Sequence, residues 1–247
     1  MDDIARFPPL ITPFRLRERE DAFQAALAGA GAAGEAHRGA GSLFYVGRFE
    51  LIEFAIVLEP EEPLWLARKI FFAGMTALAE ALSVLSPPEK PITIRYPGSL
   101  YFDGALVGGG RLGHPPGADE QSPPEWLVFG AMVRAGGVRE LGVGLAPEIT
   151  TLDDEGFDDW NPPQFAASFS RHFLVEVDSW HERGFSGIGP RYLSFLERNE
   201  AKGRRGIDEN GDLLLRGEGG EVQDRQKLIP ALARPDWFDP LLNEPRG

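Results

Sequence analysis

The chain has 247 residues, of which 43% are hydrophobic, and this is enough for a packed core. Its formal net charge of −13 argues against binding to nucleic acid or to an anionic membrane surface, since both need a basic face. There is no cysteine, no apolar run of membrane-spanning length and no sign of a secretory signal, so we expect a cytoplasmic protein without disulfides or thiolate chemistry.

The first half of the chain predicts short helices and a β-hairpin. Apolar residues recur there at helical spacing in some segments and form continuous runs in others. In chain order, the pattern predicts an irregular arm over residues 1–20, a helix over residues 21–28 capped by Asp21, two antiparallel strands within residues 42–58 that turn near Gly47, and a helix that starts at Pro63 and continues to Leu85.

Residues 92–113 are the most informative stretch of the chain. Its alternating start predicts a half-buried strand, which the Pro-Gly pair at positions 97–98 ends. The Asp-Gly pair at positions 103–104 predicts a hairpin turn. Three glycines, at positions 108–110, then stand where the next strand should continue. Because glycine weakens a strand, this run indicates either a ligand close to the backbone or a β-bulge or tight packing.

The second half predicts strands, loops and helices, followed by a tail of different character. In chain order, it predicts a proline-rich loop over residues 114–125, strands over 126–133 and 141–145, an acidic loop over 153–163, and helices over 165–183 and 191–201. In the tail, Asn210 and Gly211 lie between short runs and predict a two-residue hairpin. A small β appendage is therefore expected at this end.

The order of features over residues 95–113 resembles the catalytic core of biotin protein ligases, in the biotin/lipoate A/B protein ligase family. In that family a Lys/Arg-Trp-Pro-Asn-Asp segment leads through a turn to a catalytic lysine and then to a Gly-Gly strand. Here Arg95 and the Tyr-Pro pair after it match the first three positions, and Gly108 and Gly109 match the glycines. A Gly-Ser pair replaces Asn-Asp, and Leu106 stands at the lysine position. The scaffold positions are kept and the polar ones are changed.

The resemblance implies an α/β fold in which a mixed sheet is flanked by helices. We expect a ligase-like catalytic domain over residues 1–203 and a small SH3-like β domain with the tail over residues 204–247. The residues before position 42 leave no room for a helix-turn-helix, so the repressor role of some family members is not expected.

The resemblance also implies a set of binding residues. In the family, a Gly-Arg-Gly-Arg-Arg-Gly loop covers the acyl-adenylate, and its nearest match here is the loop over residues 37–42, for which the alternative is an ordinary surface turn. At the family's asparagine position stands Arg134, the candidate for a nucleotide contact, with a surface arginine as the alternative. The implied substrate-binding residues are Arg38, Gly39, Gly41, Ser42, Arg95, Gly108, Gly109 and Arg111.

The leucine at position 106 determines how much of the family's catalytic activity is expected in this chain. Leucine has neither a charge nor a hydrogen-bond donor, and losing an electrostatic group of this kind typically costs about 100-fold or more in rate. In a regular strand, Arg111 points to the face opposite Leu106, so it replaces the lysine only if a bulge at the glycines shifts the register. On the resemblance, we favour a ligand as the reason for the glycines. A valine at Gly109 should then block an acidic ligand and leave the fold intact.

The family reaction uses ATP and magnesium to activate an acid as acyl-AMP, and then transfers the acyl group to a lysine of a carrier protein. An active chain would thus be an ATP-dependent ligase for biotin, lipoate or a similar small carboxylic acid, with a biotinyl or lipoyl carrier domain as partner. The alternative is a catalytically degenerate protein that binds an acyl group or an acyl-carrier domain on the same scaffold. A third, weaker alternative is acyl transfer from a thioester without ATP. The four histidines show no metal-site spacing, and no resident metal is expected.

Overall fold

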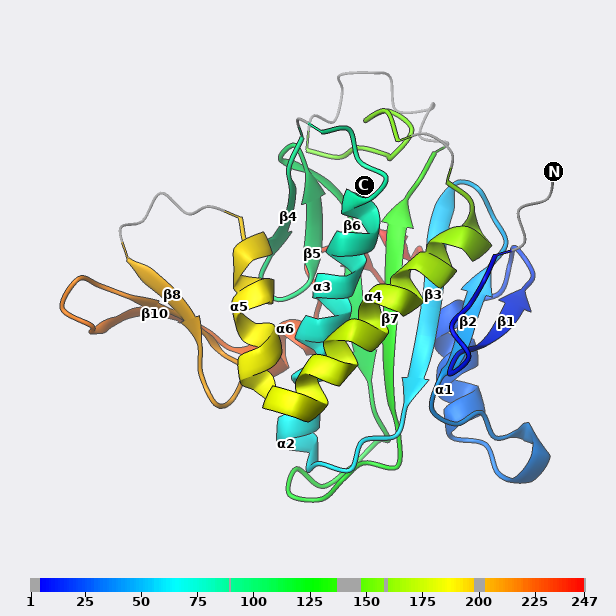
Figure 1. Cartoon of the computed structure of the whole chain (residues 1–247), viewed down its shortest axis with the longest axis horizontal. Coiled ribbons are helices and arrows are strands. Elements are labelled where there is room, and N and C mark those ends of the chain that lie inside the picture. Colours follow the sequence, from blue (N-terminus) through cyan, green and yellow to red (C-terminus); the bar gives the residue numbers. More distant parts are fainter. Residues whose placement is uncertain (1–4, 89, 137–147, 158–159, 198–202, 247) are drawn as a thin grey trace.

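The computed structural model describes residues 5–88, 90–136, 148–157, 160–197 and 203–246. The strands of its main sheet are β1 (Thr12–Leu16), β2 (Ser42–Val46), β3 (Leu51–Leu58), β4 (Ile92–Arg95), β5 (Ser99–Phe102), β6 (Ala105–Gly113) and β7 (Leu127–Arg134). They form a seven-stranded mixed sheet in the order β1-β2-β3-β7-β6-β5-β4 (Figure 1). β1 runs parallel to β2, and the other neighbours are antiparallel.

Different elements cover the two faces of this sheet. One face, the α3/α4 face, carries α3 (Ile70–Ser83) and α4 (Pro162–Arg183), which lie in front of the sheet in Figure 1. The opposite face, the α1 face, carries α1 (Ala22–Ala30) and part of the C-terminal tail. The period of two along β3 produces this division, because Phe54 packs into the α3/α4 core while its neighbour Ala55 packs under α1. The predicted α/β fold, with a mixed sheet flanked by helices, is confirmed.

The core on the α3/α4 face is aromatic and tightly packed. Phe54 and Phe169 have ring centroids 4.3 Å apart, and Phe129 stacks on Phe169 at 5.8 Å. Helix α3 crosses β7 at Gly74, where an added Cβ would lie 2.5 Å from the Phe129 ring. A glycine is therefore needed at this crossing for the helix to approach the sheet.

The predicted helices are present with shifted ends, except that the helix predicted over residues 191–201 ends at residue 195 and positions 198–201 of that prediction lie outside the described residues. Helix α1 begins at its predicted cap, since Asp21 Oδ1 accepts a hydrogen bond of 2.9 Å from the Gln24 N–H. The helix predicted from Pro63 to Leu85 is divided into α2 and α3, with Pro63 as the N-cap of α2. No helix in the described part of the chain is long and apolar enough to cross a membrane. The remaining helices are α2 (Leu64–Ala67), the 3-10 helix η1 (Gly34–Ala36), α5 (Phe185–Phe195) and α6 (Leu228–Ala233).

The arm predicted to be irregular contains strand β1, and here the prediction is wrong. β1 pairs in parallel with β2, from Thr12 opposite Ser42 to Leu16 opposite Val46. The pairing is stabilised by Phe14, whose ring stacks on Phe44 at 5.0 Å. A parallel edge strand depends on a partner far along the chain, so the local proline and charge content concealed it. The strand predicted over residues 141–145 lies outside the described residues.

The β structure predicted at the C-terminal end is present as a three-stranded antiparallel sheet of β8 (Arg204–Ile207), β9 (Leu213–Arg216) and β10 (Val222–Gln226), while its SH3-like character and its status as a separate domain stay predictions. Figure 1 shows it projecting from the side of the main sheet. Its first turn is longer than the predicted two-residue turn, because the Asp208 N–H pairs with the Asp212 carbonyl at 3.0 Å. The chain then returns to the main sheet as α6 and a short hairpin of β11 (Phe238–Asp239) and β12 (Glu244–Pro245).

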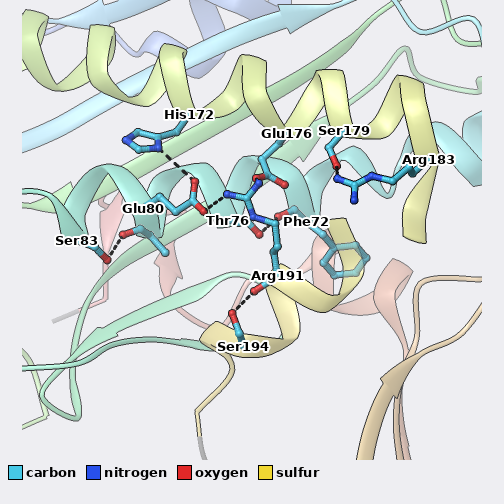
Figure 2. Close-up of polar contacts among 11 residues, drawn as sticks. Phe72, Thr76, Glu80, Ser83, His172, Glu176, Ser179, Arg183, Arg191 and Ser194 are labelled. Carbon is cyan, nitrogen blue, oxygen red and sulfur yellow. Dashed lines mark hydrogen bonds and ion pairs between the residues drawn. The ribbon is translucent and has the colours of Figure 1, made fainter. Parts of the chain in front are cut away.

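An ionic network around the buried Glu176 joins α3, α4 and α5 (Figure 2). The side chain of Glu176 on α4 is 0% exposed, and its Oε1 lies 2.6 Å from Arg191 Nη1 on α5. Arg191 also pairs with Glu80 of α3, whose other oxygen lies 3.3 Å from His172 Nδ1. Burial raises the pKa of Glu176 to about 7, although Arg191 opposes this shift.

We predict that Glu176 makes the stability of the fold fall as the pH rises. Its pKa is higher in the folded chain than the ordinary 4.5, so its contribution is fully present below about pH 4.5 and is lost as the pH rises through about 7. Glu176→Gln should match the parent protein near pH 5 and be the more stable of the two at pH 8, by at most about 3 kcal/mol. Melting curves from pH 5 to pH 8 measure this difference. The control is Glu182→Gln, an exposed site on the same helix, and parallel curves for parent and Glu176→Gln would contradict the prediction.

We propose that residues 1–203 and 204–247 are the main and small domains. Truncation after Lys202 should leave a folded α/β core, detected by circular dichroism. The melting temperature should fall, because Leu228 (0% exposed) and Trp237 (2% exposed) bury apolar surface against the core, worth about 1.5–3 kcal/mol for a large side chain. A wholly unfolded product would show instead that the tail belongs to the main domain.

Candidate functional site

Strand β6 contains a β-bulge just before its glycines. Tyr101 of β5 pairs with Leu106 and Leu100 with Gly108, so Val107 is the extra residue. Val107 packs into the α3/α4 core, whereas Leu106 joins a cluster on the opposite face. The bulge shifts the register as the sequence argument required, and it places Leu106, Gly109 and Arg111 on the α1 face.

The glycines of β6 are closely approached by protein atoms. A side chain at Gly108 would overlap the Met132 carbonyl, and one at Gly110 would overlap Met75. A Cβ at Gly109 would overlap the Gly98 carbonyl oxygen and lie 2.5 Å from Trp237 Nε1. Both non-ligand explanations from the sequence, a bulge and tight packing, are thus present. The expectation that Gly109→Val leaves the fold intact is wrong, because this side chain would collide with the backbone.

Trp237 is the residue of this surface that the sequence analysis missed. It is 2% exposed and packs with Leu51, Leu106 and Met132, while its Nε1–H donates a hydrogen bond of 3.1 Å to the Gly110 carbonyl. The available signal was the Trp-Phe pair at positions 237–238, the aromatic pair of the tail.

Arg111 is a buried cation beside the glycines. It is 8% exposed, and its guanidinium carbon lies 4.3 Å from the Phe23 ring centroid and 4.7 Å from that of Phe238. Nη2 lies 3.3 Å from Asp21 Oδ1, while the buried Nε–H has no hydrogen-bond partner in the described part of the chain. Burial lowers the pKa of Arg111 and the nearby carboxylates of Asp21 and Glu53 oppose this, so the side chain keeps its positive charge.

Glu53 is a buried carboxylate on the same face and was also missed. Its side chain is 2% exposed, and it accepts hydrogen bonds from the Ala22 N–H at 2.7 Å and from Arg48 at 2.9 Å. Burial raises the pKa of Glu53, while the Ala22 N–H and Arg48 lower it. A single glutamate inside the apolar run of β3 was the available signal.

Arg134, at the end of β7, is half-buried. Its Nη2 donates a hydrogen bond to the Pro245 carbonyl, and its buried Nη1 has no hydrogen-bond partner among the residues that the structure describes. Burial lowers the pKa of Arg134, whereas Glu244 raises it. This environment differs from that of an exposed arginine at a strand end, which was the alternative to a nucleotide contact.

The loop over residues 37–42 lies elsewhere. Arg38 donates hydrogen bonds of 2.8 Å to the Glu35 and His37 carbonyls and lies over the Phe14 ring. A side chain at Gly39 would lie 2.9 Å from Glu59 Oε1, and one at Gly41 would overlap the Leu10 carbonyl. Ser42 begins β2. In the described part of the chain, no hydrogen bond, ion pair or ring contact joins Arg38, Gly39, Gly41 or Ser42 to Arg111 or Arg134.

Arg95 lies on the edge strand β4, with its side chain 54% exposed. It pairs with Glu197 at 3.0 Å and donates a hydrogen bond of 2.7 Å to the Tyr101 hydroxyl. Tyr101 packs against the cluster that holds Leu106 and Trp237. Arg95 is therefore connected to the β6 surface through one intervening ring.

The α1 face of β6 and β7 thus combines an apolar surface with a buried arginine, Arg111, and a half-buried one, Arg134. The unpartnered N–H groups of Arg111 and Arg134 are suited to an anion such as a carboxylate or phosphate, because buried guanidinium donors are stabilised by charge-assisted hydrogen bonds. The described residues contain no group of three or more metal-ligating side chains.

Comparison with known proteins identifies the family. Residues 7–194 match the model of the biotin/lipoate A/B protein ligase family, and the chain belongs to this family. A biotin--[acetyl-CoA-carboxylase] ligase of Paracoccus denitrificans is 26% identical over an alignment of 217 residues. The alignment covers 81% of this chain and 84% of that protein. The expected family resemblance is confirmed.

Solved structures agree with this assignment. A biotin protein ligase-like protein of unknown function from a Silicibacter species superposes with a TM-score of 0.74 at 28% identity, over 93% of this chain and 98% of that one. The biotin protein ligase of Aquifex aeolicus, in complex with biotin and ATP, superposes with a TM-score of 0.61 at 16% identity, over 87% and 98% of the chains. The second likeness concerns the fold alone.

Proposed function

We propose that this chain is a biotin/lipoate protein ligase-like protein that binds a small carboxylic acid on the α1 face of β6. Biotin and lipoate are the leading candidates, because the family is defined by them and relatives are named for biotin. A biotinyl or lipoyl carrier domain is the proposed macromolecular partner, and the cytoplasm the proposed location.

One observation carries this proposal: the buried guanidinium of Arg111 lies beside Gly109 and keeps an unpartnered Nε–H. A carboxylate held there would satisfy that donor and add a charge-assisted hydrogen bond. The apolar surface of Leu106 and Met132 would contact the body of the acid. We propose Gly108, Gly109, Arg111 and Arg95 as substrate-binding residues on this surface. A role for Arg38, Gly39, Gly41 and Ser42 in substrate binding stays a separate proposal from the family resemblance, because the described residues place their loop away from Arg111.

ATP and magnesium are proposed for the case in which the chain is an active ligase. Bound ATP would supply the adenylyl group that activates the acid, with pyrophosphate as the leaving group, and magnesium would accompany its phosphates. The unpartnered Nη1–H of Arg134 fits an anionic oxygen, so we propose Arg134 as the nucleotide contact.

The second version is a catalytically degenerate binding protein, and Leu106 favours it. Leu106 is 9% exposed and packs with Leu51, Met132 and Trp237, so the family's lysine position is part of an apolar cluster. Arg111 shares its face and is the side chain that would have to stabilise the developing charge in its place.

We predict that biotin-dependent pyrophosphate exchange with Mg-ATP is at or near background. The reason is the missing charge at Leu106, since loss of such a group typically costs about 100-fold or more. The Aquifex aeolicus biotin protein ligase serves as the positive control for the assay. Robust exchange would support the ATP-dependent ligase and direct attention to Arg111.

We further predict that Arg111→Ala weakens acid binding by about 1.5–3 kcal/mol, the range for a hydrogen bond to a charged group. The affinity of Arg111→Lys for the acid should lie between those of the parent and the alanine variant, because lysine keeps the charge and lacks the planar guanidinium. Calorimetry with biotin, and melting curves of each variant, measure this. Arg171→Ala, an exposed site on α4, is the control. Equal affinity in all four proteins would exclude Arg111 from the site.

A further inference from the structure

The end of the described chain forms a closed unit, residues 237–246, which we call the C-terminal hairpin. Phe238 pairs with Pro245 and Asp239 with Glu244. The last residue of the hairpin returns to its start, since the Arg246 N–H donates to the Trp237 carbonyl at 2.6 Å and Arg246 Nε–H to the Phe238 carbonyl at 3.0 Å. These bonds let the hairpin move as one body.

The hairpin covers the surface to which the acid is assigned. Its indole ring, from Trp237, lies against Gly109 and hydrogen-bonds the Gly110 carbonyl. Its phenyl ring, from Phe238, covers one side of the Arg111 guanidinium. The polar contact of Pro245 with Arg134 fixes the other strand of the hairpin.

Little space is left beside Trp237, the first residue of the hairpin. The cavity that Trp237 lines with Gly98, Ser99, Gly110 and the connector from α6 has a volume of about 10 Å³, which is hardly enough for one water molecule, and Trp237 Nε1 lies 2.5 Å from where a Cβ would stand at Gly109. An acid of the size of biotin therefore cannot reach Gly109 while Trp237 stays in place.

We propose that the C-terminal hairpin is a displaceable strap that occupies the acid-binding surface, and that an acid binds only when the strap leaves. This inference rests on the proposed function. The Trp237 indole occupies the position where the flat ring of an acid with an N–H donor would bind. The Phe238 ring occupies the position next to the Arg111 guanidinium. A ligand that replaces Trp237 must restore a donor to the Gly110 carbonyl, because a buried acceptor without a partner is costly. Biotin carries ring N–H groups and octanoate does not, so biotin should replace the strap more readily.

The attachment of the hairpin is compatible with release. It follows α6, whose first residue, Leu228, is fully buried and anchors the helix. Residues 234–236 connect this anchor to Trp237. The tip of the hairpin is unsupported, since Leu241 is 93% exposed and Leu242 is 69% exposed.

Removing the indole ring tests the strap. The apparent dissociation constant is the intrinsic one divided by the fraction of molecules that are open, so a strap that is open in about one molecule in ten weakens binding about ten-fold. Calorimetry with biotin should give a dissociation constant about ten-fold lower or more for Trp237→Ala than for the parent, with a smaller gain for octanoate. Trp237→Phe, which keeps a ring but loses the N–H, should lie between them. Leu241→Ala, on the exposed tip, is the matched control and should equal the parent.

The outcomes separate the two proposals. Equal biotin affinity in the parent, Trp237→Ala and Leu241→Ala would overturn the strap alone. No binding of biotin or octanoate to any of these proteins would overturn the proposed function and the strap with it.

Hydrogen exchange on the parent protein gives a second test that does not depend on how the variants fold. At saturating biotin, amides of the hairpin should exchange faster and those of residues 108–111 more slowly. Slower exchange in the hairpin on binding would show that it closes over the acid, and this would overturn displacement.

Discussion

Strand β6 is approached closely on both of its faces, and the rest of the molecule is arranged around this constraint. On the α3/α4 face, Met75 and Phe129 leave no room for a side chain at Gly110. On the α1 face, Trp237 leaves none at Gly109. Only glycine accepts neighbours at these distances, and the close approach is what lets one strand contact both the main core and the tail.

The charges on the α1 face depend on one another. Arg111, Asp21 and Glu53 are withdrawn from water together, and an isolated member of this group would cost several kcal/mol to bury (about 3–5 when one partner of a buried pair is removed). The surrounding protein carries a net charge of −13, so its surface repels large polyanions. A buried arginine inside an acidic protein is suited to a small anion that can enter the fold.

Local signals in the sequence predicted local structure. The Asp-Gly hairpin turn is confirmed by φ angles of 48° at Asp103 and 85° at Gly104, and the cap of α1 is confirmed at Asp21. The site depends on contacts between distant segments, which single-sequence patterns do not contain. The glycines indicated that something approaches β6, but Trp237 lies 127 positions from the carbonyl that it contacts. The loop at Arg38 has a composition that is plausible for a binding loop. It lies beyond the C-terminal end of α1, whereas Arg111 contacts Asp21 at the N-terminal end.

The bulge at Val107 affects how relatives of this chain are compared. One extra residue reverses the facing of every position from there to the end of β6. If a relative lacks the bulge, an alignment that runs without a gap from the preceding turn will therefore match residues that face opposite sides of the sheet. Loss of this residue during evolution would carry Arg111 into the aromatic layer, so strand length and the identity of that position are expected to change together.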